Sequence, residues 1–205
     1  MTNRPPLADL LDPPTHQRMI RLAHLHGRRL RQREIDRFAE FGIRALDLGN
    51  PWPVLADRVV FEGDFFVFDD DVGEKGEPAF TFVVISNAGF IDIVAWQPET
   101  NRHAVWCGQG FALGERQIHH PNPLIPGLPV FRSAMGWLRG GRRGIVIVRA
   151  EFAKLVLAAV PLLVAEDKQH QRDLQEVFPL GGGGPEIIVA PPPPMIIDSP
   201  MEGIS

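Results

Sequence analysis

Four short segments rich in β-branched and aromatic residues lie close together in the first half of the chain. They constrain the fold more than any other feature does. The segments cover residues 65–68, 80–86, 90–96 and 103–107. Turn-forming residues separate them at 69–78, 87–89 and 98–102. Because these connections are short, we expect the segments to form an antiparallel β-meander.

The last hairpin of this meander indicates how the sheet is covered. We expect Gln97 to pair with His103, so that Ala95 lies opposite Val105. Apolar side chains then occupy both faces of the sheet, and both faces need to be covered by other parts of the chain. A shift of one residue in this pairing would exchange the faces of one strand.

Helices are expected before the meander. Residues 15–31 have the apolar spacing of an amphipathic helix, and residues 33–41 form a second one that ends at Gly42. Two such helices with several arginines allow a helix-turn-helix interpretation. Glu34, Asp36 and Glu40 on the second helix would repel phosphate, which favours a solvated charged face.

The segment after the meander alternates loop, strand and helix. Residues 119–129 contain four prolines and are expected to form a loop without regular pairing. Ser133 is the expected N-cap of a helical turn that ends at Arg139 and Gly140. A strand at 145–148, helices at 150–160 and 166–178, and a strand at 187–190 follow. This length is sufficient for a parallel crossover.

These elements predict an α+β fold with N-terminal helices, a central antiparallel β-meander and a C-terminal β-α-α-β segment. We divide the chain into an N-terminal helical region (1–50), an α+β core domain (51–190) and a disordered proline-rich tail (191–205). With 205 residues, of which 44% are hydrophobic, the chain is long enough for a substantial core.

Composition points to a soluble cytoplasmic protein. The longest apolar run, residues 155–165, is interrupted by Pro161 and is about half the ~20 residues that a membrane span needs. Residues 1–11 do not have the pattern of a signal peptide. One cysteine, Cys107, allows no internal disulfide. We therefore expect a reducing compartment and no membrane partner.

Charge is unevenly distributed along the chain. Residues 116–149 contain six arginines and no Asp or Glu, whereas residues 61–115 contain ten acidic residues against Lys75 and Arg102. A net charge of −4 therefore conceals a basic block and an acidic block. Such segregation indicates a surface that meets a charged partner, either nucleic acid, another protein or a second copy of the chain.

The basic block has its densest part at residues 137–144, where three arginines and three glycines precede a buried strand. Glycine lets backbone amides approach an anion, and arginine matches the geometry of phosphate. A tryptophan there can stack on a base. The candidate nucleic-acid-binding residues are Arg132, Trp137, Arg139, Arg142 and Arg143. The alternative is a solvated helix-to-strand turn with Trp137 in the core.

Catalytic and metal-binding patterns are weak. His103 and Cys107 lie ~13 Å apart on an extended strand, too far apart to bind one ion or to form a nucleophilic pair. Pairing of Cys107 with His119 or His120 leaves a small hydrolase or transferase as an alternative function. We predict no metal and no cofactor.

Two stretches, DIVAWQPETNRHAVWCGQGFALGE (92–115) and VFRSAMGWLRGGRRGIVIVR (130–149), together resemble a group of uncharacterised bacterial, often prophage-associated, proteins. This resemblance implies a mobile-element context, in which nucleic-acid-handling proteins are common. The leading hypothesis is a non-enzymatic accessory protein that contacts nucleic-acid phosphates. The alternatives are a protein–protein or self-assembly module and the Cys/His enzyme.

Overall fold

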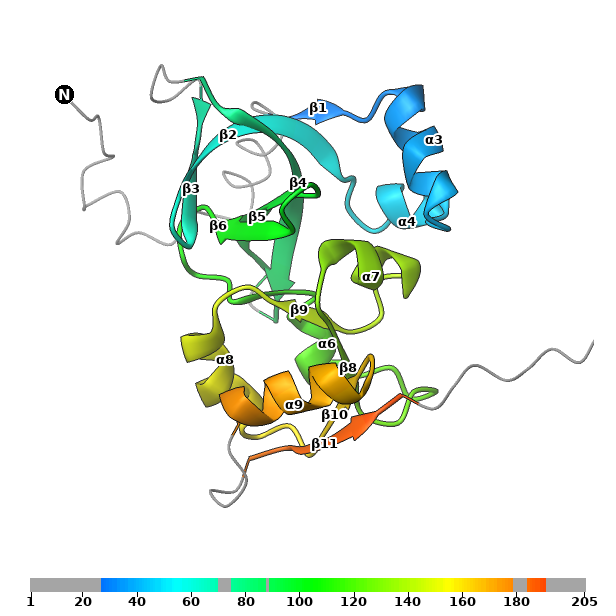
Figure 1. The fold of residues 1–205 in the computed structure, drawn as a ribbon, viewed down its shortest axis with the longest axis vertical. Coiled ribbons are helices and arrows are strands. Elements are labelled where there is room, and N and C mark those ends of the chain that lie inside the picture. Colours follow the sequence, from blue (N-terminus) through cyan, green and yellow to red (C-terminus); the bar gives the residue numbers. More distant parts are fainter. Residues whose placement is uncertain (1–26, 70–74, 88, 179–183, 191–205) are drawn as a thin grey trace, which may run out of the picture.

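The computed structural model describes residues 27–69, 75–87, 89–178 and 184–190. Within these ranges the chain forms a barrel-like sheet from its first half and a mostly parallel sheet from its second half (Figure 1). Helices make up 28% and strands 35%, as an α+β fold requires. The arrangement of the strands differs from the predicted one in both halves.

The first sheet is a meander that two further strands close into a barrel. It contains β1 (Arg28–Arg29), β2 (Leu55–Glu62), β3 (Phe65–Phe68), β4 (Glu77–Ser86), β5 (Gly89–Gln97) and β6 (Arg102–Val105). Strands β4, β5 and β6 form an antiparallel meander, as expected, but the fourth expected member, β3, does not pair with β4. Strand β2 pairs with β4 through its first half and with β3 through its second half, and β3 then meets β6. Closure leaves fewer free edges than an open meander would.

The predicted pairing of β5 with β6 is wrong by one residue. Trp96 pairs with His103 and Ala95 with Ala104, because the turn contains only residues 98–101. Trp96 therefore shares a face with Val105 and packs toward the helices, while Ala104 faces the barrel interior with Phe66. Both faces are buried, as the apolar pattern predicted.

The second sheet has the strand order β11-β10-β8-β9-β7. Strands β8 (Leu128–Phe131), β9 (Ile145–Ile147), β10 (Leu162–Ala165) and β11 (Glu186–Val189) are parallel, and β7 (Ala112–Leu113) is an antiparallel edge. Helices α7 (Ala134–Arg139), α8 (Ala150–Leu157) and α9 (Lys168–Val177) connect the parallel strands, and α6 (Arg116–His119) follows β7. The single predicted crossover is therefore replaced by three.

The edge strand β7 and two of the parallel strands, β8 and β10, were not predicted. Strand β8 begins at Leu128 and includes Pro129, which was assigned to a loop. Pro129 lies opposite Val164 of β10, and the pairing of these two strands includes only two residues from each. Strand β10 follows Pro161, which separates it from α8. Its four residues continue the apolar run of the helix, so that hydrophobicity alone does not mark the boundary.

The strand order creates a switch point between β8 and β10. From β8 the chain crosses through α7 to β9, which lies on one side of β8. The later strands β10 and β11 lie on the other side of β8. In open parallel sheets, ligands bind outside the carboxyl ends of the strands at this point. Here those ends lead into Arg132 and Ser133 after β8, and into Glu166 and Asp167 after β10.

Helices α3 (Gln32–Glu40) and α4 (Ala45–Gly49) cover the barrel beside α7 (Figure 1). Helix α3 confirms the helix predicted at 33–41, and Gly42 has the positive φ of +76° that a C′ glycine adopts. The helix expected at 15–31 lies outside the described residues up to 26, and Arg28 and Arg29 are in β1 instead. Residues 191–205 also lie outside them. Among the described helices, none has the length and apolarity to cross a membrane.

Candidate functional site

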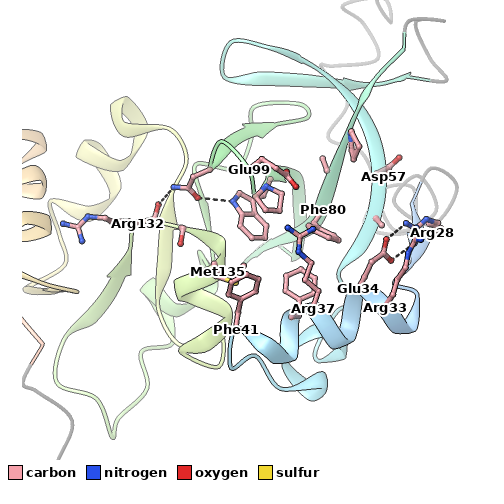
Figure 2. A pocket seen from close by; sticks show the side chains of 18 residues that line it. Arg28, Arg33, Glu34, Arg37, Phe41, Asp57, Phe80, Glu99, Arg132 and Met135 are labelled. Carbon is pink, nitrogen blue, oxygen red and sulfur yellow. Dashed lines mark hydrogen bonds and ion pairs between the residues drawn. The ribbon is translucent and has the colours of Figure 1, made fainter.

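A groove of about 740 Å³ lies between α3, the outer face of β4 and β5, the turn at 98–101 and the start of α7 (Figure 2). It extends to Arg132 and Ser133, which follow the carboxyl end of β8. The groove therefore begins at the barrel and reaches the switch point of the parallel sheet. A volume of this size falls within the range of ~300–1,000 Å³ typical of ligand sites.

The floor of the groove is aromatic. Phe80 of β4 lies with its ring centroid 4.9 Å from that of Phe38 and 6.0 Å from that of Trp96. Trp96 is itself held in place, because its indole nitrogen donates a 3.1 Å hydrogen bond to Asn101. Phe41, at the end of α3, also lines the groove and is 41% exposed. Because Phe38 and Trp96 are buried, the accessible part of this floor is provided by Phe80 and Phe41.

Arginines of α3 form one rim. Arg33 and Arg37 are one helical turn apart and both line the groove. Arg28 lies beside them but is bonded to Glu34 at 2.5 and 2.8 Å, and this pairing lowers the pKa of Glu34 to about 2. Figure 2 shows Arg28 and Arg33 at one end of the groove, with Arg37 between them and Arg132. The rim also contains the carboxylates Asp57 and Glu99.

Of the predicted nucleic-acid-binding residues, Arg132, Arg139 and Arg143 are exposed. Arg139 Nε donates a 2.7 Å hydrogen bond to the carbonyl oxygen of Phe41, which ties the end of α7 to the end of α3. Arg143 lies close enough to Asp47 of α4 to lower its pKa, although Arg44 has the larger effect. Arg139 is thus adjacent to the end of α3, which lines the groove, and Arg143 lies near α4, which packs beside α3.

Trp137 and Arg142 do not lie on that surface. Trp137 is 5% exposed and donates a 2.9 Å hydrogen bond to the carbonyl oxygen of Gly144. Arg142 lies over the Trp137 ring and donates to the carbonyl oxygen of Trp52 at 2.8 Å. Burial lowers the pKa of Arg142 to about 10. For these two residues the prediction of surface contact is corrected, and the alternative with Trp137 in the core is the observed one.

Arg132 lines the groove but its charge is engaged elsewhere. Its guanidinium bonds both carboxylate oxygens of Asp167, at 2.5 and 2.9 Å, and approaches Asp173 to 3.6 Å. In Figure 2 this guanidinium points away from the groove floor. Its backbone nitrogen donates to Glu166 at 2.7 Å. Arg132 therefore closes the crevice between β8 and β10 instead of presenting a free cation.

Cys107 lacks the environment of a nucleophile. Its thiol donates a 3.5 Å hydrogen bond to the carbonyl oxygen of Ile91, and burial beside Asp92 raises its pKa to about 12. A thiol with that pKa is protonated at neutral pH, and reactivity requires the thiolate. His119 ends α6 and His120 follows it. In the described ranges, no group of three or more His, Cys, Asp or Glu residues is placed to hold a metal ion.

The sequence pattern did not single out Arg33, Arg37 or the aromatic floor as candidate site residues. The spacing of the two arginines on a helix whose apolar face contains Phe38 was visible, but a solvated face was the preferred interpretation. Phe80 and Trp96 were predicted only as strand residues. Their convergence depends on how α3 packs against the barrel, which no local pattern specifies.

Comparisons with protein-family models, with curated proteins and with solved structures gave no match.

Proposed function

We propose that this chain is a non-enzymatic accessory protein that binds nucleic acid through four arginines beside the groove. We call Arg33, Arg37, Arg139 and Arg143 the groove-side arginines. Their placement supports the proposal: two lie on α3, one ends α7 and one is in the turn that follows α7, and the bond from Arg139 to Phe41 joins these elements. A planar guanidinium matches the geometry of phosphate oxygens.

The charges of these arginines are available. None of the four forms an ion pair with another residue of the described ranges, in contrast to Arg28, which pairs with Glu34. Contacts from such side chains to phosphate release counterions, so we expect affinity that falls with salt. Because phosphates carry no sequence information, we expect little sequence preference from these contacts.

The accessory role in a bacterial mobile element depends on the resemblance of residues 92–115 and 130–149 to prophage-associated proteins. Phosphate binding suits such a role, since a protein of this context handles nucleic acid without needing catalytic residues. The burial of Cys107 and the raised pKa of its thiol support the non-enzymatic part of the proposal.

The test is fluorescence anisotropy of the full chain with labelled single-stranded and double-stranded DNA and RNA across a salt series. Replacement of all four groove-side arginines by glutamate should abolish binding. The matched control carries the same change of net charge on exposed cations of the second half: Arg116→Glu, Lys154→Glu, Lys168→Glu and Arg172→Glu.

The control variant should retain most of the affinity, because its cations lie on α6, α8 and α9. Equal losses in the two variants would mean that net charge, and not this surface, governs binding. The absence of binding at low salt to any of the four nucleic acids would refute the proposal.

A second candidate is self-assembly, which an exposed apolar face of α8 favours. Phe152, Leu155 and Val156 are 41%, 78% and 36% exposed on one helix. Arg149 stacks on both Phe152 and Phe65, which extends this face to β3. Neighbouring exposed apolar side chains of this kind mark interaction surfaces.

A further inference from the structure

We propose that the groove holds an unpaired base of a single-stranded nucleic acid, with the neighbouring phosphates against the groove-side arginines. This inference rests on the proposed function and adds to it the form of nucleic acid that is bound. It also assigns a role to the aromatic floor, which phosphate contact alone leaves unexplained.

The floor provides a stacking surface for a planar ring. Phe80 is half-buried, and its ring packs against the tilted rings of Phe38 and Trp96. Phe41 adds a second, exposed ring to the lining of the groove. Bases of any sequence stack on aromatic rings, and proteins that bind single strands combine such rings with a positively charged groove.

A paired base does not reach this floor. In a duplex the bases are stacked on each other and present only their edges in the grooves. The floor lies between α3 and the barrel, on the inner side of the arginines of the rim (Figure 2). A base therefore reaches Phe80 only when its strand is unpaired, whereas the phosphates of either form can reach the arginines.

The charges at the rim favour an anionic occupant over an apolar peptide. Arg33 and Arg37 stand on one wall without ion pairs to other described residues, and the carboxylate of Glu34 is neutralised by Arg28. Asp57 and Glu99 are the other acidic residues of the lining. An apolar peptide would cover the aromatic floor but would give Arg33 and Arg37 no negatively charged partner.

The experiment compares three labelled ligands by anisotropy with the full chain: a single-stranded oligonucleotide, an abasic oligomer of the same length and a duplex. The abasic oligomer keeps the phosphates and lacks the bases. We expect the single strand to bind about tenfold more tightly than the abasic oligomer, in the range that one base–aromatic stack produces. The duplex should behave like the abasic oligomer.

Phe80→Leu keeps an apolar side chain against Phe38 and Trp96 but removes the ring. It should weaken binding of the single strand about tenfold and leave binding of the abasic oligomer unchanged. Phe65→Leu, at a 40% exposed phenylalanine of β3, is the matched control and should change neither. Phe41→Ala, at an exposed position, provides a second variant in case Phe80→Leu does not fold.

Equal affinities for the three ligands would overturn this inference while leaving the proposed function intact. Unchanged single-strand binding in folded Phe80→Leu or Phe41→Ala would also overturn it and would favour another occupant, such as an apolar peptide. Failure of all three ligands to bind at low salt is a different result, because it refutes the proposed function itself.

Discussion

Arg142 and Glu115 are charged residues whose side chains are held in the interior by backbone groups. Arg142 donates to the carbonyl oxygen of Trp52, and Glu115 accepts hydrogen bonds from the backbone nitrogens of Phe111 and Ala112. Arg143, the next residue after Arg142, is exposed. Charge alone therefore does not indicate which residue of a basic cluster meets solvent.

Glu115 gives a prediction about pH. Burial, with a smaller contribution from Asp92, raises the pKa of Glu115 to about 7, from 4.5 when unfolded. The stability that this group contributes is present below pH 4.5 and is lost as the pH rises through 7. The Glu115→Gln variant should therefore lose less free energy of unfolding between about pH 5 and about pH 8 than the wild type, by roughly 1–3 kcal/mol.

Urea denaturation at both pH values measures this difference. The glutamine keeps an oxygen for the two backbone donors, so the comparison isolates the ionisation of the carboxyl group. An identical pH dependence in the two proteins would contradict the raised pKa.

At the scale of elements, the turn between β5 and β6 determines both the register of the barrel and its attachment to the second sheet. Asn101 has a φ of 53°, which asparagine tolerates better than most residues. Its side chain accepts from Trp96 at 3.1 Å and donates to the carbonyl oxygen of Arg132 at 3.3 Å. One turn residue therefore supports the groove floor and links it to the end of β8.

Substitutions at Asn101 should separate the contribution of its side-chain hydrogen bonds from that of its positive φ. Asn101→Gly loses both side-chain bonds but tolerates the positive φ, and Asn101→Ala loses the bonds and adds backbone strain. We expect Asn101→Ala to lower the free energy of unfolding by about 2–4 kcal/mol. Asn101→Gly should be less destabilising than alanine by about 1 kcal/mol. Chemical denaturation of the three proteins tests this order, and a glycine variant less stable than alanine would contradict it.

At the scale of the whole molecule, the two charge blocks of the sequence do not become two surfaces. Arg132 is bonded to α9, Arg142 is in the interior and Arg149 lies against α8. On the acidic side, Asp92 and Glu115 are buried. The basic surface combines part of the arginine turn with α3, which belongs to a different part of the sequence. The barrel and the parallel sheet share a core in which Trp96 and Val146 belong to one cluster.

The exposed face of α8 leads to a prediction about assembly. If this face joins two copies, the mass of the protein in solution should rise with concentration. The Leu155→Lys variant should remain a monomer, because a buried lysine without a partner is costly. Leu124→Lys is the control, since Leu124 is 87% exposed and lies in the loop before β8. Light scattering over a concentration series measures the mass, and a monomeric wild type at all concentrations would exclude self-assembly through α8.

Local patterns predicted the elements that have strong periodicity or clear end signals. The strands β3, β4 and β5, the helix α3 with Gly42 and the N-cap Ser133 of α7 all confirm the prediction. Strands β8 and β10 were missed because they are short and fully apolar, and because Pro129 argued against pairing. Strand β2 was also missed, although it closes the barrel.

The sequence by itself determined the mixture of helix and strand, the meander and the need to cover both of its faces, since these depend on residues that are near each other in the chain. Only the tertiary structure decided the closure of the barrel, the strand order of the second sheet and the groove. It also decided which arginines are available, because burial and ion pairing depend on long-range packing. Arg37 and Arg139 are 102 positions apart in the sequence, yet the contact of Arg139 with Phe41 places them on adjoining elements.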